Sequence, residues 1–191
     1  MRHRVFIAVN LPEDVKRKLS DYQSKWQELP GKWTKKENLH LTLVFLGYLI
    51  DEEVAEVCKI AKGVAVKHSP FSITLNKVCY GPPGKMPPRM IWVQGEKSKE
   101  LANLKDDLEN SLMEDIRSAL SVKGGGRDFS PHLTLARIRQ WEFRRIEPED
   151  RPEVDENISL SFNVNSIEVM ESVLKKGGPE YIVLESAEFK S

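Results

Sequence analysis

The sequence predicts an α+β fold, and three observations support that class. The predicted elements run strand, helix, strand, helix, strand, strand, helix, strand, strand, strand, an order that mixes hairpin-like neighbours with helical crossovers and favours antiparallel or mixed sheets. The 191 residues suffice for one substantial core or two small lobes that share an interface. The tetrapeptide His-Leu-Thr-Leu occurs at residues 40–43 and again at 132–135, in similar strand-like surroundings. We therefore expect one compact unit over residues 1–191.

The first half of the chain alternates strands with helices. Residues 5–11 predict a strand, and Pro12 followed by two acidic residues favours the start of a helix. Apolar residues at helical spacing would form the buried stripe of that helix: Val15, Leu19, Tyr22, Trp26 and Leu29. Pro30-Gly31 ends it. Further elements are expected in this order: a strand at 39–46, a helix at 51–66, and strands at 71–78 and 90–94.

The second half begins with a loop that has little conformational freedom, because residues 80–88 hold four prolines and two glycines. A third helix is predicted over 98–120, with an apolar stripe of Leu101, Leu104, Leu108, Leu112 and Ile116. The glycines at 124–126 lack the Lys-Ser/Thr of a P-loop and open no helix, so they predict a flexible connector. The last strands are expected at 132–138, at 158–174 with a bend, and at 181–189.

Composition excludes several classes of protein. Lys+Arg and Asp+Glu both number 29, and this balance argues against a protein that coats nucleic acid through bulk electrostatics. Cys58 and Cys79 are too few for a disulfide framework and form no CxxC pair, so we expect two buried thiols. Asn10 and Pro12 end the first apolar run well short of a signal peptide, and no other stretch could span a membrane. A cytoplasmic protein is expected.

The repeated tetrapeptide carries the functional prediction. Alternation along a strand would place His40 and Thr42 on one face and the leucines on the other, and His132 and Thr134 would repeat that arrangement. A single His-x-Thr is more often part of an ordinary strand. Two copies facing each other would instead set two imidazoles and two hydroxyls around one spot, as an acid and a base require. The other two histidines lack such surroundings: His3 lies near a terminus that is expected to fray, and His68 in an expected surface turn.

Hydrolysis of a phosphodiester without a metal suits these residues. It needs a base for the water, an acid for the leaving oxygen and donors for the phosphate oxygens, which Thr42 and Thr134 could supply. Arg137 could add positive charge, but it alternates with 133 and 135 and reaches the site only through a bulge, a twist or its own length. A metal site is disfavoured because no carboxylate stands at ligand spacing and His-x-x-x-His is absent. A serine nucleophile is disfavoured because G-x-S-x-G is missing.

Four segments together resemble a known family. These are residues 4–9, 37–47, 88–92 and 129–137, and through them the chain resembles the bacterial and archaeal RNA 2′,3′-cyclic phosphodiesterases, also called 2′-5′ RNA ligases, of the 2H phosphoesterase superfamily. The resemblance implies a two-lobed, pseudo-twofold α+β fold in which two strands flank a basic central cleft. It also implies His40 as the proton donor and His132 as the proton acceptor. Thr42, Thr134 and Arg137 would hold the phosphate, with no metal and no cofactor.

The same resemblance sets the expected reaction and partners. A terminal 2′,3′-cyclic phosphate of RNA would be opened to a 2′-phosphate, and related chemistry could join tRNA halves through a 2′-5′ linkage. We expect a monomer that acts on such RNA ends and has no membrane contact. The alternatives are a 2H phosphodiesterase acting on small cyclic nucleotides or 2′-5′ oligonucleotides, and a noncatalytic module that binds RNA ends. The presence of both histidines argues against the last.

Local contacts with an RNA strand are harder to assign. Basic residues that could meet RNA, or equally form a solvated surface, are Lys32, Lys35, Lys36, Arg127, Arg139, Arg144 and Arg145. Trp33, Tyr48 and Phe129 could stack on a terminal base or equally belong to the core.

Overall fold

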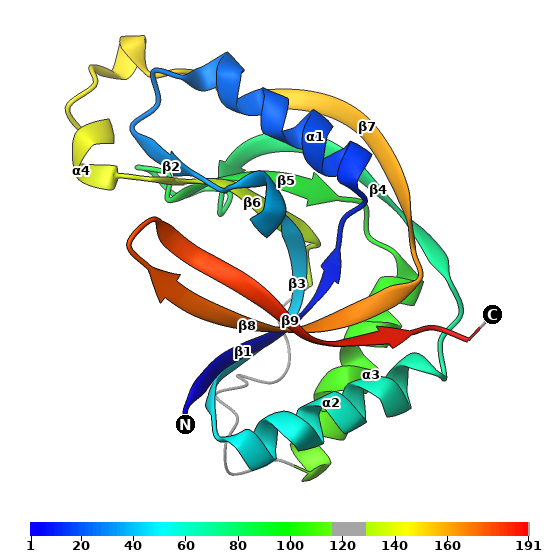
Figure 1. The fold of residues 1–191 in the computed structure, drawn as a ribbon. Helices are drawn as coiled ribbons and strands as arrows, with labels where there is room; N and C mark the ends of the chain where they lie inside the picture. Colours follow the sequence, from blue (N-terminus) through cyan, green and yellow to red (C-terminus); the bar gives the residue numbers. More distant parts are fainter. Residues whose placement is uncertain (116–128, 191) are drawn as a thin grey trace.

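Two antiparallel sheets form the body of the protein in the computed structural model, which describes residues 1–115 and 129–190 (Figure 1). The first sheet has the order β3 (His40–Leu49), β1 (His3–Asn10), β8 (Ser166–Lys175) and β9 (Gly178–Glu188). The second has the order β2 (Gly31–Trp33), β6 (His132–Ile138), β5 (Met90–Gly95), β4 (Phe71–Gly81) and β7 (Asp155–Val164). Every pair of neighbouring strands is antiparallel, so the α+β prediction is confirmed in its antiparallel form.

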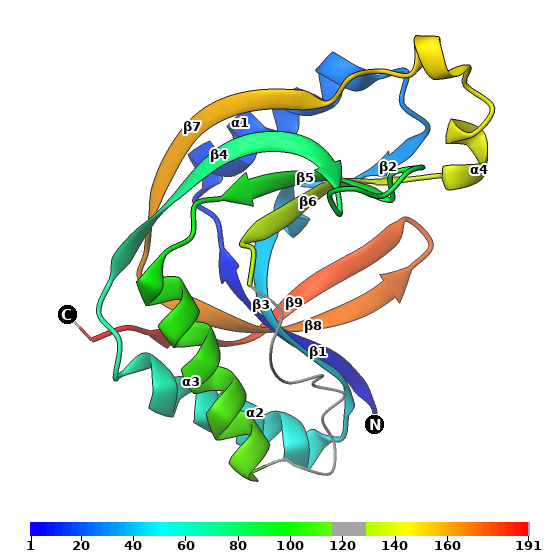
Figure 2. The same ribbon diagram turned by 180° about the vertical axis from the view of Figure 1, so that it is seen from behind.

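Helices lie on the outer sides of the sheets. Their bounds are α1 (Glu13–Asp21), α2 (Asp51–Ala65), α3 (Lys99–Asp115) and α4 (Gln140–Phe143), with short 3-10 turns η1 (Tyr22–Trp26), η2 (Lys36–Asn38) and η3 (Pro148–Asp150). Figures 1 and 2 show α2 and α3 side by side next to the first sheet and α1 along the second. The expected first helix is thus an α-helix followed by a 3-10 turn, and its stripe is still buried at Trp26 and Leu29.

The two sheets repeat one strand order. The order β3-β1-β8-β9 in the first sheet corresponds to β6-β5-β4-β7 in the second. His40 pairs with Asn10 on β1, and His132 pairs with Gln94 on β5, so the two tetrapeptides begin equivalent strands. This correspondence is the pseudo-twofold arrangement that was expected. Strand β2, on the outer edge of β6, has no counterpart beside β3 among the described residues.

The segment expected to be one bent strand at 158–174 is instead two strands in different sheets. Strand β7 pairs with β4 in the second sheet, and β8 pairs with β1 and β9 in the first. Asn165 alone separates them. Before Asn165 the buried residues are at even-numbered positions, Phe162 and Val164. After it they include the odd-numbered Ile167 and Val169, because the chain crosses there from one sheet to the other.

Strand β2, turn η2 and helix α4 were not predicted, because each is only three or four residues long. The third helix is described as far as Asp115. The expected continuation through Ile116 to residue 120, the glycines at 124–126 and Arg127 lie outside the described residues.

The main hydrophobic core takes side chains from both sheets and from the helices. The leucines of both tetrapeptides belong to it, and each is at most 4% exposed: Leu41, Leu43, Leu133 and Leu135. A second, smaller cluster is formed by Phe6, Ala8 and Met170, with Tyr181 packed against it. Phe6 and Tyr181 also contact the imidazole of His40, so the smaller cluster lies on the face of the first sheet that carries this histidine.

Candidate active site

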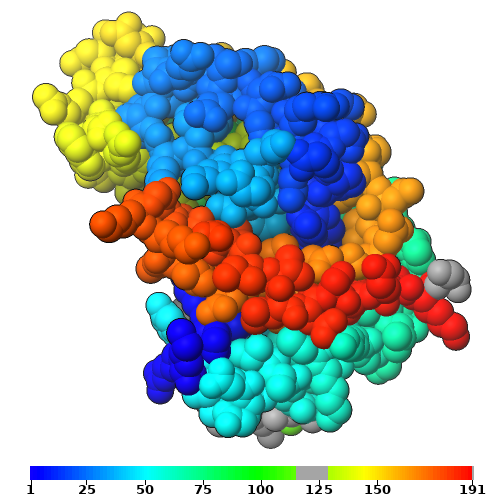
Figure 3. All heavy atoms as spheres, in the orientation of Figure 1, coloured from blue at the N-terminus to red at the C-terminus, as the bar shows by residue number. Residues whose placement is uncertain are grey.

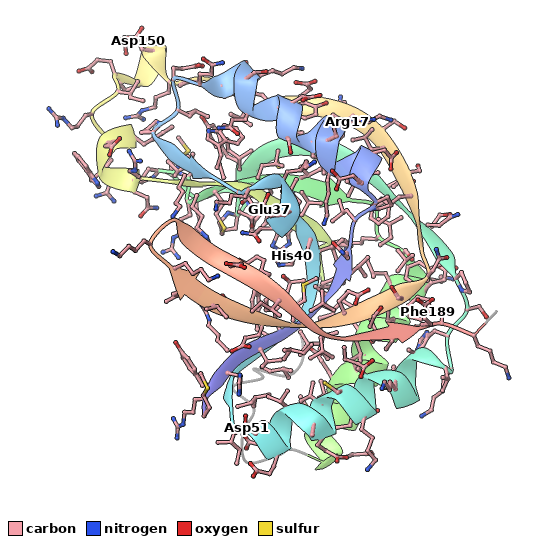
Figure 4. The ribbon with its side chains drawn as sticks, in the orientation of Figure 1. Arg17, Glu37, His40, Asp51, Asp150 and Phe189 are labelled. Carbon is pink, nitrogen blue, oxygen red and sulfur yellow. The ribbon has the colours of Figure 1, made fainter. Side chains whose placement is uncertain are left out.

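Strands β3 and β6 belong to different sheets but lie next to each other in the fold. Figure 4 shows His40 between the two sheets. The first seven residues of each strand have the same burial pattern, with a half-buried histidine and threonine separated by a fully buried leucine. The structure therefore brings His40 and Thr42 on β3 close to the strand that carries His132 and Thr134.

The two histidines make the same backbone hydrogen bond. His40 Nδ1 lies 2.7 Å from the carbonyl oxygen of Asn38, and His132 Nδ1 lies 2.8 Å from the carbonyl oxygen of Ser130. A carbonyl oxygen only accepts, so Nδ1 carries the proton and donates it in both rings. Nε2 of each neutral ring is then left to accept a proton, and Nε2 of each charged ring can donate one. A free Nε2 on a ring is what a general acid or a general base requires.

The surroundings of His40 are aromatic. Its ring centre lies 4.9 Å from that of Phe6 and 5.0 Å from that of Tyr181, which meets it edge-on. Burial lowers the pKa of His40 below its usual value, the hydrogen bond to the Asn38 carbonyl opposes that shift, and the positive charge of Lys16 adds to it. Lys16 is itself buried on α1, with Nζ 3.5 Å from the carbonyl oxygen of Glu37.

The imidazole of His132 stacks on Trp92, with 3.8 Å between ring centres and 23° between ring planes. Trp92 is 9% exposed and pairs with Thr134 across β5 and β6. Gly81 leaves room for this indole, because a Cβ at Gly81 would lie 2.2 Å from it. The tryptophan therefore fixes the plane of the His132 ring from the strand next to β6.

Arg137 reaches the same face through a β-bulge. Ile91 pairs with Ala136 and Trp92 pairs with Thr134, so Leu135 has no partner on β5 and the alternation of β6 shifts by one residue. Thr134 Oγ1 and Arg137 Nη1 lie 3.8 and 4.0 Å from the same sulfur, Sδ of Met90. A bulge is one of the three ways, with a twist and the length of the side chain, in which the sequence predicted that Arg137 could reach the side of the strand that carries His132.

Thr34, just after β2, holds the bulged backbone. Its amide donates to the carbonyl of Leu135 at 2.7 Å, and its hydroxyl donates to the carbonyl of Thr134 at 2.8 Å. Two backbone acceptors of the bulge are thus satisfied from the side of β2.

Strand β3 contains the same bulge at Leu43, since Ala8 pairs with Thr42 and Ile7 pairs with Val44. Phe45 therefore occupies the position on β3 that Arg137 occupies on β6. Phe45 is 63% exposed, and its ring centre lies 6.1 Å from that of Phe6. We call the six residues His40, Thr42, Phe45, His132, Thr134 and Arg137 the candidate face. Sequence reasoning missed Phe45, although its spacing from His40 equals that of Arg137 from His132.

Three further residues of the site escaped sequence reasoning. Trp92 lay in a predicted strand without a motif, and Phe6 and Tyr181 come from the two ends of the chain. Their contacts with the histidines depend on strand pairing between distant segments, which no local pattern reports.

The aromatic residues that were considered for base stacking divide into two groups. Trp33 and Phe129 pack against the main core. Tyr48 is 62% exposed near the end of β3, so a role in stacking stays a prediction for this residue.

The basic residues also differ in their partners. Lys36 is paired with Glu13, and Arg139 with Glu142. Lys32, Lys35, Arg144 and Arg145 are exposed, and none of them has an ion-pair partner within the described ranges.

Neither remaining histidine belongs to the candidate face. The expectation of a fraying end at His3 is wrong, because this residue belongs to β1 and is held by Asp51 at 2.7 Å and Glu171 at 2.8 Å. His68 lies just after α2 and pairs with Asp107 at 3.0 Å. Cys58 and Cys79 are free, partly buried thiols whose pKa is raised by burial.

No group of three or more His, Cys, Asp or Glu side chains that could hold a metal ion occurs in residues 1–115 and 129–190. No helix in these ranges is long and apolar enough to cross a membrane.

Comparisons with known proteins agree with this geometry. The family model described as LigT like Phosphoesterase matches residues 9–92. Relatives named RNA 2′,3′-cyclic phosphodiesterase are 31% identical in Thermus thermophilus, over 95% of this chain and 88% of the relative, and 30% identical in Archaeoglobus fulgidus, over 93% and 96%. A relative of the same name from Thermotoga maritima is 29% identical over 98% of this chain and 96% of its own.

Solved structures show the same fold. A crystal structure from Thermus thermophilus superposes with a TM-score of 0.84 at 29% identity, covering 98% of both chains. Escherichia coli LigT, solved in complex with 3′-AMP, superposes with a TM-score of 0.77 at 22% identity over the whole of both chains, a likeness of fold alone. The equivalent His-x-Thr strands and the relatives that match nearly end to end lead to one conclusion: the chain belongs to the LigT-like phosphoesterases, the family of the RNA 2′,3′-cyclic phosphodiesterases.

Proposed function

We propose that this protein hydrolyses the terminal 2′,3′-cyclic phosphate of RNA to a 2′-phosphate, with His40 as proton donor and His132 as proton acceptor. One observation carries the proposal: two equivalent strands present a His-x-Thr face with the same Nδ1 tautomer, so both Nε2 atoms can exchange protons with a substrate. The names of the relatives supply the substrate class.

The proposed reaction needs one proton moved at each histidine. His132 Nε2 takes a proton from water as the water oxygen bonds to phosphorus. The bond from phosphorus to the 3′ oxygen breaks, and His40 Nε2 gives its proton to that oxygen. The product keeps the phosphate on the 2′ oxygen. If a 5′-hydroxyl replaces water, the same steps make a 2′-5′ linkage.

The phosphate is held by neutral and charged donors of the candidate face. The hydroxyl of Thr42 has no hydrogen-bond partner among the described residues, and Thr134 makes only the long contact to the sulfur of Met90. Both hydroxyls can therefore turn to non-bridging oxygens. Arg137 adds a permanent charge and up to five N–H donors. These groups act as fixed dipoles and a charge where the phosphorane develops, which is the main source of stabilisation in such sites.

The acid role of His40 requires the bound substrate. Burial lowers the pKa of His40 and so disfavours the charged ring in the free protein. A phosphodiester carries one negative charge, and an anion within a few ångströms favours the imidazolium. We infer that substrate binding supplies the protonated donor by raising the pKa of His40.

The proposal extends to the partner and the setting. The proposed enzyme is a cytoplasmic monomer that acts on RNA ends with a cyclic phosphate, tRNA fragments among them.

Product analysis tests this function. An oligoribonucleotide that ends in a 2′,3′-cyclic phosphate is incubated with the protein in EDTA, and the 2′- and 3′-phosphate products are resolved. The expected product is the 2′-phosphate, formed at the same rate with and without the chelator. The same oligonucleotide with an open 3′-phosphate is the matched control and should not change.

Three results would contradict the proposal. Loss of activity in EDTA with recovery by one divalent metal would indicate a metallohydrolase. Turnover confined to small cyclic nucleotides or 2′-5′ oligonucleotides would favour the related 2H activity. Binding of the RNA end without turnover would favour a noncatalytic module.

A further inference from the structure

Strand β2 breaks the twofold relation between the sheets, and it adds a positive charge beside the candidate face. In the antiparallel pair of β2 and β6, Lys32 lies directly opposite Arg137. Residues that face each other across an antiparallel pair project from the same face of the sheet. Lys32 therefore extends the face that carries Thr134 and Arg137, and in the part of the chain that the structure describes β3 has no such neighbour.

These two cations lack an anionic partner among the described residues. Within residues 1–115 and 129–190, the Arg137 side chain contacts only the sulfur of Met90, and Lys32 has no ion pair. Both side chains are exposed. Like charges directly opposite each other destabilise a sheet, so this pairing has a cost that a bound anion would offset.

The tip of the β8–β9 hairpin accommodates the lysines. A Cβ at Gly178 would lie 2.7 Å from Nζ and 3.2 Å from Cε of Lys32, and one at Gly177 would lie 3.7 Å from Nζ of Lys35. Asn38 Nδ2 donates to the carbonyl of Pro179 at 2.7 Å and ties the hairpin to this region. Figure 3 shows the orange-red hairpin against the light-blue residues that precede His40. Lys32 and Lys35 thus approach the hairpin at its two glycines, where no side chain of the hairpin is in the way.

The cations form a track that leads away from the catalytic histidines. Thr134 and Arg137 share the sulfur of Met90, and Lys32 lies one strand further, about 5 Å from Arg137 between Cα atoms. The nearest additional charge on an RNA end is the phosphate on the 5′ oxygen of the terminal nucleoside. Basic side chains spaced along a protein surface can follow a nucleic-acid backbone from one phosphate to the next.

We propose that Lys32 binds the internucleotide phosphate just upstream of the terminal cyclic phosphate, with Arg137 between the two phosphates. This inference rests on the proposed function and names its substrate class: an RNA strand end rather than a free nucleoside cyclic phosphate. Lys35 and the glycines of the hairpin tip line the path by which the strand leaves.

Three substrates and three proteins test the subsite. The substrates are a nucleoside 2′,3′-cyclic phosphate with a free 5′-hydroxyl, a dinucleotide ending in the same group, and that dinucleotide with an uncharged methylphosphonate linkage. The proteins are the wild type, Lys32→Gln and the matched control Lys18→Gln, whose lysine is exposed on α1.

The wild type should use the charged dinucleotide with a kcat/KM about tenfold above the other two substrates, the scale of one charge-assisted hydrogen bond. In Lys32→Gln, the ratio of kcat/KM for the charged dinucleotide to kcat/KM for either other substrate should fall toward one. In Lys18→Gln this ratio should stay as in the wild type. With the charged dinucleotide, the slope of log kcat/KM against log salt should also fall by about 0.7 in Lys32→Gln, as expected for one lost phosphate contact on a single strand.

The outcomes separate this inference from the proposed function. If no substrate with a cyclic phosphate is hydrolysed by the wild type, the proposed function fails. If all three are hydrolysed but the wild type does not distinguish the charged linkage from the methylphosphonate, the subsite is wrong and the function stands. An unchanged ratio in Lys32→Gln would also overturn the subsite. The methylphosphonate comparison uses the wild-type protein and is independent of how the variant folds.

Discussion

His40 and His132 have the same tautomer but different neighbours. His40 is packed between Phe6 and Tyr181 in a buried cluster, and His132 stacks on the face of Trp92. Equal backbone hydrogen bonds explain why both can act at Nε2. The surroundings of His40 do not by themselves favour its proposed role as proton donor, because burial lowers its pKa in the free protein, so that role depends on the bound phosphate.

Removal of either ring should abolish most turnover. We expect His40→Ala and His132→Ala each to lower kcat on a cyclic-phosphate oligonucleotide by at least about 10²-fold, the usual scale for a positioned acid or base. The double variant should be little worse than either single one, because the two act as a unit. Steady-state kinetics measure this, with His68→Ala as the histidine control. A single variant that keeps near-full kcat would contradict the paired mechanism.

The pKa of His40 should depend on a bound anion. In the free protein, ring titration by NMR should give a pKa below the usual 6.5, with the His40→Gln spectrum providing the assignment. Addition of inorganic phosphate should raise this pKa, and Lys16→Met should raise it slightly in the free protein because a positive charge is removed. A His40 pKa above 6.5 in the free protein, or one that falls with phosphate, would show that substrate binding does not supply the donor.

At the scale of elements, the β-bulge decides which side chains reach the candidate face. Each strand has one extra residue, Leu135 on β6 and Leu43 on β3, which shifts the alternation of its side chains. Arg137 and Phe45 therefore lie on the same side of their strands as the preceding His-x-Thr. Of these two strands, β6 alone has an additional strand beside it among the described residues, and Thr34, just after that strand, holds the bulge through two hydrogen bonds.

Thr34 should therefore act as a positioning residue for Arg137. Thr34→Val removes the hydroxyl bond to the Thr134 carbonyl and should lower kcat/KM by about fivefold, the scale of one neutral hydrogen bond. In an Arg137→Ala background the same change should matter less, since the group it positions is gone. Thr74→Val, which loses a hydroxyl contact to Ser161 on β7, is the control. Equal effects of Thr34→Val in both backgrounds would indicate a general loss of stability instead.

At the scale of the whole molecule, one core joins the two related halves. The main cluster contains buried leucines from both tetrapeptides together with side chains of α1, α2 and α3. The crossing at Asn165 carries the chain directly from the second sheet into the first. We propose that the halves do not fold separately, in keeping with a single domain over residues 1–191.

Unfolding should then occur in one transition. Far-UV circular dichroism and tryptophan fluorescence should give the same urea midpoint, and Leu133→Ala, at a position 1% exposed, should lower the free energy of unfolding by about 2–5 kcal/mol without splitting that transition. The exposed change Lys18→Gln is the control. Midpoints that differ between the two probes would show that the lobes unfold independently.

The sequence alone predicted most of the strand-and-helix order, although it missed β2 and α4 and merged β7 with β8, and it singled out His40 and His132 as one candidate site. Both depend on local periodicity: apolar residues recur with the period of a helix or a strand, and each His-x-Thr alternates with leucines that are in fact buried. The resemblance to a family then supplied His40 as proton donor and His132 as proton acceptor, and it supported the phosphate-binding roles of Thr42, Thr134 and Arg137, all as expectations.

Only the tertiary structure decided how Arg137 joins that face, which aromatic rings enclose the histidines, and where the segment at 158–174 changes sheets. Each depends on pairing between segments far apart in the chain. A bulge exists only relative to a partner strand, Tyr181 meets His40 only after β9 joins the sheet through β8, and Lys32 faces Arg137 only because β2 joins the edge of β6. Periodicity reports which face a residue occupies, but the neighbour across that face is set by long-range packing.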